Sequence, residues 1–206
     1  GLVPGYVPGR VKKRLASFEP SINLIKTCHI PMLCMEWAFR KRPDLIEQAM
    51  VTNSFHLKGR LSFETFVGAL DIAKPPAGGG IGCMSFESRY NLPFFLAKYV
   101  DVVCSHQWIN VPNYLLYDSW YLNFPVVSNV PNVPGYSYPG FDARLGGDAI
   151  IKAITEHDTP ARLEQYADEC DLFLETVLAT SETNVRAHCE ALDEVFAQAR
   201  HGGDPS

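Results

Sequence analysis

The middle of the chain, residues 100–129, alternates between apolar runs and a spacing typical of a helix. Residues 100–104 and 124–127 are short, valine-rich runs that contain one charged residue, Asp101. Such runs are typical of strands that are covered on both faces. Between them, apolar and tyrosine residues recur every three or four positions over residues 111–121, which predicts a helix of about three turns. A strand, a helix and a strand in so short a stretch predict a right-handed parallel crossover.

Helical and strand patterns also precede and follow this central unit. Helices are expected over residues 22–42, 61–72, 91–99, 145–157, 160–178 and from 182 onward, with one or two further helical turns over 43–49. Strands are expected over residues 50–52 and 83–86. Residues 1–20 are rich in glycine, proline and basic side chains and are interpreted as a lead-in segment. The chain is therefore predicted to be one α/β domain over residues 1–206, a Rossmann-like parallel sheet flanked by helices, with C-terminal helices over residues 159–200.

Polar residues follow both strands of the central unit, at the edge where open parallel sheets bind ligands. Ser105, His106 and Gln107 follow the first strand, and Asn129 follows the second. Asn113 lies near the amino end of the helix between them, where free backbone N–H groups and the helix dipole favour phosphate. We expect these side chains to line one cleft and to hydrogen-bond phosphate or hydroxyl groups. A histidine in such a position either acts as a base or packs and caps.

Two other stretches are rich in glycine and proline. Residues 75–82 follow a predicted helix and precede a predicted strand, which is the reverse of a phosphate-binding Rossmann loop, so they are interpreted as a flexible connection. Residues 130–142 contain three prolines, two glycines, Tyr136 and Tyr138. The prolines argue against a central strand. The two tyrosines either face a ligand or pack in the core, and the sequence leaves both interpretations open.

The composition fits a single domain and excludes some partners. The 206 residues are 47% hydrophobic and 20% charged, which allows a substantial buried core. The net charge of −5 argues against a protein that binds the phosphate backbone of nucleic acid. No apolar run is long enough to span a membrane and no signal peptide is evident, so a cytoplasmic location is expected. The six cysteines form no CxxC pair and are interpreted as free thiols.

Sequence motifs of metal enzymes and of hydrolases are missing. The chain contains no HExxH motif, no clustered Cys/His ligand set and no GxSxG elbow. We therefore predict no metal ligand and no cofactor, and another parallel α/β enzyme, such as a hydrolase, ranks as the least favoured interpretation.

One spacing within the central unit resembles that of a known enzyme family. Asp118 stands seven positions before Pro125, which two valines follow. This arrangement resembles the C-terminal, donor-binding half of retaining GT-B glycosyltransferases. Four segments together resemble a bacterial group of such enzymes that was once catalogued as a domain of unknown function: GYVPGR, FEPSINLIKTCHIPMLCMEWAFRKRPDL, SHQWINVPNYLLYDSWYLNFPVVSN and GYSYPGFD. The similarity extends from about Tyr6 to His157.

The resemblance implies a function and a set of partners. It implies transfer of a sugar from a nucleotide-diphosphate sugar to a saccharide or protein acceptor, without a tightly held metal. A GT-B enzyme has two halves and this chain has room for one, so an N-terminal acceptor-binding domain or a partner subunit is expected. Asn110 replaces the first glutamate of the common carboxylate pair, and Asp118 replaces the second. A non-catalytic nucleotide-sugar-binding or protein-interaction module of the same fold is the alternative.

The resemblance also implies roles for residues along the chain. Arg10 and Lys26 resemble the basic pair that stabilises the departing diphosphate. Asp118 would accept hydrogen bonds from ribose hydroxyls, and Arg89 follows an earlier strand, where enzymes of this fold hold the base. Glu19 would face the sugar or take part in a buried ion pair. The predicted catalytic residues are Lys26, Arg10 and His106.

Overall fold

The computed structural model describes residues 4–19, 25–109 and 113–201 of the chain. Its centre is a six-stranded sheet made of β1 (Lys13–Ser17), β2 (Ile46–Val51), β3 (Met84–Phe86), β4 (Val102–Cys104), β5 (Val126–Ser128) and β6 (Tyr136–Ser137). The strands lie in the order β3-β2-β1-β4-β5-β6, and every neighbouring pair is parallel. This topology confirms the predicted Rossmann-like sheet. The strand order changes direction between β1 and β4, which is the topological switch point.

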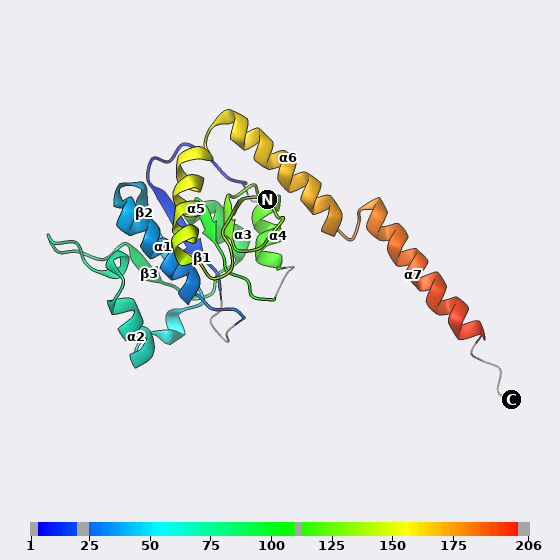
Figure 1. Cartoon of the computed structure of the whole chain (residues 1–206), viewed down its shortest axis with the longest axis horizontal. Helices are drawn as coiled ribbons and strands as arrows, with labels where there is room; N and C mark the ends of the chain where they lie inside the picture. The colour runs from blue at the N-terminus through cyan, green and yellow to red at the C-terminus, as the bar shows by residue number, and fades with distance from the viewer. Residues whose placement is uncertain (1–3, 20–24, 110–112, 202–206) are drawn as a thin grey trace.

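Helices cover both faces of the sheet (Figure 1). The α-helices of the described residues are α1 (His29–Lys41), α2 (Leu61–Gly68), α3 (Leu92–Tyr99), α4 (Tyr114–Tyr121), α5 (Ala143–Glu156), α6 (Pro160–Val177) and α7 (Glu182–His201), and α7 extends away from the sheet. Successive strand residues point to opposite faces. Leu15 therefore packs in the core with α1, α2 and α5, whereas Ala16 packs in a second core with α3, α4 and α6. None of the described helices combines the length and apolar composition needed to cross a bilayer.

The central strand β1 corrects the prediction of a lead-in segment. Residues 13–17 pair with both β2 and β4, although the strand begins with two basic residues. Lys13 is buried and its Nζ lies 2.6 Å from Asp158 Oδ2. Arg14 forms an ion pair with Asp101, with 3.0 Å between Nε and Oδ2. The strand was missed because its charges are neutralised by residues far away in the sequence.

Two element boundaries also differ from the prediction. The expected helical turns over residues 43–49 are confined to a 3-10 turn at Pro43–Leu45, and β2 begins at Ile46. The helix expected over residues 61–72 ends with α2, and a separate 3-10 turn covers Asp71–Ala73. Both errors arise because the apolar runs are too short for their spacing to distinguish a strand, an α-helix and a 3-10 turn.

Helices α1 and α4 and strand β6 also differ from the prediction or extend beyond the described residues. Helix α1 begins at His29 with Pro31 in its first turn, so the predicted helix starts too early: residues 25–28 are described and are not helical, while residues 22–24 lie outside the described residues. Helix α4 begins at Tyr114, while residues 111 and 112 of the predicted helix also lie outside them. The loop over residues 130–142 contains β6, a two-residue edge strand. An edge position is compatible with the neighbouring prolines.

Helices α1 and α5 pack at very short range because α5 contains two adjacent glycines. A Cβ atom on Gly147 would lie 2.7 Å from Trp37 Cβ and 2.9 Å from the backbone nitrogen of Ala38. A Cβ atom on Gly146 would collide with Cys34 Sγ. Because α1 follows β1 and α5 follows β6, the amino ends of both helices lie toward the carboxyl edge of the sheet.

Candidate functional site

A cleft of about 720 Å³ opens at the carboxyl edge of the sheet. We call it the carboxyl-edge cleft; it is lined by Phe18, Glu19, Lys26, Thr52, Asn53, Arg89, Tyr90, Asn91, Leu92, Asn113, Tyr114, Leu115 and Asp118. These residues come from the segments after β1, β2 and β3 and from the start of α4. The cleft therefore lies beside the switch point, where open parallel sheets bind their ligands.

Five residues predicted from the sequence meet in this cleft. They are Glu19, Lys26, Arg89, Asn113 and Asp118. Their positions follow from the fold, because the carboxyl ends of parallel strands share one edge and the helix after β4 starts there. The cleft thus combines two cationic side chains, two carboxyl groups and an amide.

Asp118 lies one turn into α4 and presents its carboxylate to the cleft. Partial burial raises the pKa of this carboxyl above its ordinary value. Within residues 4–19, 25–109 and 113–201, no group donates a hydrogen bond to the carboxylate and no cation pairs with it. A partly buried carboxylate without such partners can accept hydrogen bonds from ligand hydroxyls. Asn113 caps the same helix, since its Oδ1 accepts from Leu115 N at 3.1 Å.

Glu19 forms the wall of the cleft at the switch point and is only 1% exposed. Its Oε1 accepts from Ser105 Oγ at 2.7 Å and from Gln107 Nε2 at 2.9 Å. Burial raises the pKa of Glu19 to about 7, although the hydrogen bonds and the nearby charge of Lys26 act in the opposite direction. The carboxyl therefore changes its protonation state near neutral pH.

Ser105, Gln107 and Asn129 lie behind this wall and do not line the cleft. Gln107 Nε2 also donates to Ser105 Oγ at 2.8 Å. The side chain of Asn129 holds the backbone of Gln107, with 2.7 Å from Gln107 N to Oδ1 and 2.7 Å from Nδ2 to Gln107 O. The prediction that Gln107 and Asn129 share a cleft with Asn113 and Asp118 is therefore wrong; they support it from behind.

His106 and Tyr138 are both buried, and Tyr138 packs in the core that also contains residues of α1 and α5. His106 Nδ1 lies 3.0 Å from Tyr138 Oη, which also donates to the carbonyl oxygen of Ser105 at 3.1 Å. Burial lowers the pKa of His106 to about 4, so the imidazole is neutral at neutral pH. Neither residue lines the carboxyl-edge cleft.

Tyr136 is buried in β6 and its Oη lies 3.2 Å from His157 Nδ1. Its ring also packs edge-on against the His157 ring. Together with the burial of Tyr138, this placement supports the packing interpretation of both tyrosines over the ligand-facing one.

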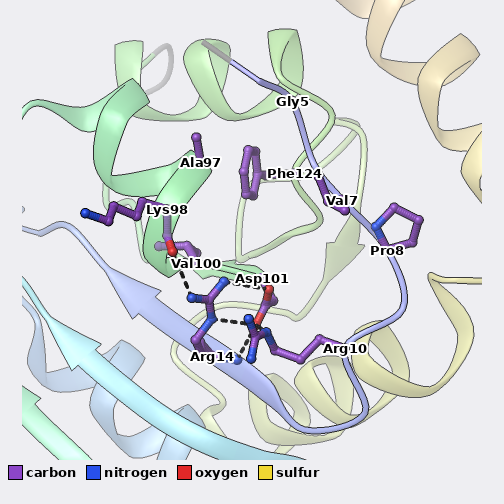
Figure 2. A pocket seen from close by; sticks show the side chains of 10 residues that line it. All are labelled: Gly5, Val7, Pro8, Arg10, Arg14, Ala97, Lys98, Val100, Asp101 and Phe124. Carbon is purple, nitrogen blue, oxygen red and sulfur yellow. Dashed lines mark hydrogen bonds and ion pairs between the residues drawn. The ribbon is translucent and has the colours of Figure 1, made fainter.

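Arg10 lies at the opposite edge of the sheet from Lys26. Figure 2 shows it in a pocket of about 410 Å³ at the amino edge, beside Arg14 and Asp101. Its Nη1 lies 3.1 Å from Glu47 Oε2, and its Nε lies 3.3 Å from Asp101 Oδ2. Arg10 precedes β1 whereas Lys26 follows it, so the length of the strand separates them. The predicted basic pair is therefore not formed.

Several residues of the cleft were missed by the sequence reasoning, among them Thr52, Asn53 and Tyr90. Asn53 follows β2 in the left-handed conformation, with φ of 56°, and its Nδ2 donates to the carbonyl oxygen of Phe18 at 2.9 Å. Tyr90 stacks on Phe95, with 4.9 Å between ring centroids, and is 47% exposed. The sequence did contain a signal for Thr52 and Asn53. They are polar residues directly after a strand, which is the same feature that identified Ser105.

The described part of the chain offers no ready metal site. Over these residues, no three His, Cys, Asp or Glu side chains converge in a way that could hold a metal ion. Positive charge in the cleft comes instead from Lys26 and Arg89.

Solved structures with a similar fold are glycosyltransferases. An alpha,alpha-trehalose-phosphate synthase (UDP-forming) from Burkholderia vietnamiensis is 14% identical, with a TM-score of 0.61 over 92% of this chain and 45% of its own. The pneumococcal O-GlcNAc transferase GtfA, in complex with UDP and GlcNAc, is 12% identical, with a TM-score of 0.60 over 94% of this chain and 38% of its own. A variant of S. aureus TarM, in complex with UDP and other ligands, is 8% identical, with a TM-score of 0.59 over 90% of this chain and 36% of its own.

These likenesses confirm the predicted fold, which is that of one Rossmann-like half of the GT-B architecture. The chain spans less than half the length of the three proteins. No curated protein matches its sequence. A family profile described as "Protein of unknown function (DUF2827)" matches residues 2–192. Since that match covers most of the sequence, the chain belongs to the DUF2827 family.

Proposed function

We propose that this chain is the donor-binding domain of a glycosyltransferase that moves a sugar from a nucleotide-diphosphate sugar to a saccharide or protein acceptor. The observation that carries the proposal is the carboxyl-edge cleft. It lies at the switch point of a GT-B-like half and brings two cationic side chains together with a carboxylate that no described residue pairs. Its volume is also within the range of about 300–1,000 Å³ that is usual for small-molecule sites.

Each group in the cleft suits one part of such a donor. Lys26 and Arg89 would neutralise the diphosphate, and this would remove the need for a metal or cofactor during departure of the nucleotide. Asp118 would accept hydrogen bonds from the ribose diol. Tyr90 is an exposed aromatic ring that would stack on the base.

UDP is the first nucleotide to test, because GtfA and TarM were both solved in complex with UDP. We expect saturating UDP to raise the melting temperature of the chain. A ligand at about 100 times its Kd stabilises the folded state by about 2.7 kcal/mol. Asp118→Asn and Lys26→Met are each expected to weaken UDP binding about ten-fold or more, since each removes a charged partner of the ligand.

Matched controls are available on exposed surfaces. Asp171→Asn on α6 and Lys12→Met before β1 change the same residue types at exposed positions outside the cleft. Both are expected to keep the affinity of the unmodified chain. The proposal fails if UDP, GDP, CMP, dTDP and their sugar conjugates all leave the melting temperature unchanged.

A partner half would complete the enzyme, and α7 offers a surface for it. Figure 1 shows α7 extending away from the sheet. Leu192, Val195 and Phe196 are each 56–60% exposed on this helix. We propose that an acceptor-binding half, in the same polypeptide or in a partner subunit, packs on this apolar face.

Hydrogen–deuterium exchange checks this part of the proposal. The α7 amides are expected to exchange rapidly in this chain alone, because few contacts hold the helix to the domain. They should become protected when the acceptor-binding half is present. Equal exchange in the two samples would contradict the proposed packing.

The non-catalytic alternative is favoured by one sequence feature. Asn110, which lies outside the described residues, stands where related enzymes carry a glutamate. A module of this kind would bind UDP but transfer no sugar even with the acceptor-binding half present. Measurement of sugar transfer by the two halves together separates the two functions.

A further inference from the structure

The hydrogen bonds around His106 define which of its ring nitrogens carries the proton. Tyr138 Oη has one proton, and it donates that proton to the carbonyl oxygen of Ser105 at 3.1 Å. In its 3.0 Å contact with His106 Nδ1, we therefore assign the hydroxyl oxygen as the acceptor. Nδ1 then carries the hydrogen of the neutral ring, and Nε2 carries a lone pair.

This lone pair has no partner in the part of the chain that the structure describes. His106 is fully buried, and among the described residues no group donates a hydrogen bond to its Nε2. A buried acceptor left unpaired is costly, so such atoms in native proteins call for an explanation. A ligand that brings a hydroxyl donor would satisfy it.

One exposed aromatic side chain, Phe141, lies against this imidazole, and a second, Trp108, lies against Phe141. The ring of Phe141 lies 4.6 Å from the ring of His106, and the ring of Trp108 lies 5.9 Å from that of Phe141. Phe141 is 52% exposed and Trp108 is 40% exposed. Contiguous exposed apolar surface often marks a binding site.

The backbone at this point is also strained. Ile109 follows Trp108 with φ of 54°, a left-handed conformation that a β-branched residue rarely adopts, and its side chain is 87% exposed. Strain of this kind costs about 1–3 kcal/mol and is concentrated at functional sites. Burial of the Ile109 side chain does not compensate for it.

His106, Trp108 and Phe141 lie at the same sheet edge as the carboxyl-edge cleft. The hydrogen bonds of Glu19 with Ser105 and Gln107 separate them from it. His106 follows β4, and Phe141 directly precedes Asp142, the residue that caps α5. Gln107, between His106 and Trp108, is hydrogen-bonded to Glu19, which lines the cleft. A ligand in the cleft and a second group on the aromatic rings would thus face the same edge.

We propose that Trp108, Phe141 and His106 form a subsite for a pyranose ring. The aromatic rings would pack against the apolar C–H face of the sugar, and His106 Nε2 would accept a hydrogen bond from one of its hydroxyls after the Phe141 side chain rotates. The inference rests on the proposed function and adds a location for saccharide. The ring comes either from the hexose of the donor or from an acceptor saccharide, and the two sources give different binding data.

Calorimetric titration distinguishes the sources. The probes are UDP, UDP-glucose and UDP-N-acetylglucosamine, and, in the presence of UDP, methyl glucoside and methyl N-acetylglucosaminide. If the donor hexose occupies the subsite, a UDP-sugar binds about ten-fold more tightly than UDP, and Trp108→Ala removes that advantage without changing the affinity for UDP. If an acceptor occupies it, a methyl glycoside binds to the unmodified chain and not to Trp108→Ala. Tyr121→Ala, which removes an exposed ring from α4, is the control and leaves all these affinities unchanged.

Nitrogen NMR of the imidazole provides an independent measurement. The free chain is expected to show a protonated Nδ1 and an unprotonated Nε2 in His106, and a bound sugar is expected to shift the Nε2 signal. The subsite is refuted if none of the four sugar-containing probes moves that signal and Trp108→Ala changes no sugar affinity, while UDP still binds. Conversely, sugar binding that depends on Trp108 with no binding of UDP would retain the subsite and refute the nucleotide-sugar function.

Discussion

Replacement of Asp101 by alanine is expected to lower the free energy of unfolding by about 3–5 kcal/mol. The carboxylate is 4% exposed and joins the start of β4 to the start of β1 (Figure 2). Its Oδ2 accepts from the backbone nitrogen of Arg14 at 2.8 Å and from Arg14 Nε at 3.0 Å, and its Oδ1 accepts from Nη2 at 3.1 Å. Without it, a largely buried guanidinium loses its charged partner and keeps the carbonyl oxygen of Lys98, while the backbone N–H of Arg14 loses its acceptor. Urea unfolding at pH 7 measures the loss.

A surface ion pair provides the comparison for this variant. Asp148 pairs with Lys41 at 2.5 Å, and both side chains are more than 40% exposed. Asp148→Ala should therefore cost less than about 1 kcal/mol. If the two variants lose a similar free energy of unfolding, the buried hydrogen bonds of Asp101 stabilise the fold no more than an exposed ion pair does.

The sheet illustrates what sequence patterns can and cannot predict. β4 and β5 were predicted because continuous valine-rich runs need no long-range information. β1 was missed, although it is central, because only three of its five residues lack a charge. Its charged residues become acceptable in the core through Asp101 and Asp158, which are 87 and 145 positions away from Arg14 and Lys13. Such compensation appears only once the chain has folded.

The candidate site shows the same limit at the level of side chains. The predicted order of strands and helices indicated which residues reach the carboxyl edge, and Asn113 and Asp118 do line the cleft there. It did not tell which way each side chain points, so Gln107 and Asn129 were expected in the cleft although they bond to each other behind it. Lys26, Arg89 and Glu19 were selected through the family resemblance, whereas spacing alone gave no reason to choose them.

The protonation of Glu19 gives the second large expected effect. Below pH 4.5, its ordinary pKa, the carboxyl is protonated in both the folded and the unfolded chain. As the pH rises, the unfolded chain releases the proton first, while the folded chain keeps it up to a pKa of about 7. The free energy of unfolding therefore falls between these two values. At 1.36 kcal/mol for each pH unit, the total is about 3 kcal/mol.

Glu19→Gln isolates this contribution, because the amide cannot ionise and its Oε1 can still accept from Ser105 and Gln107. The buried histidines His106 and His157 have lowered pKa values, so they change stability with pH in the opposite direction in both proteins. The difference between variant and unmodified chain cancels their effect. We expect urea unfolding from pH 4.5 to pH 8 to show the variant gaining about 3 kcal/mol relative to the unmodified chain. Glu164→Gln on the exposed side of α6 should give a difference that varies by less than about 0.5 kcal/mol.

A flat difference curve for Glu19→Gln would mean that Glu19 is already ionised at pH 5 and that its buried charge is compensated. A rising curve has a consequence for the cleft. Glu19 would then be largely neutral below pH 7, where the wall adds no negative charge near Lys26 and Arg89, and ionised above it. Because an added negative charge repels a diphosphate, UDP should bind more weakly at pH 8 than at pH 6, and Glu19→Gln should reduce this dependence. Calorimetric titration of UDP into both proteins at the two pH values tests the link between the charge of Glu19 and nucleotide affinity.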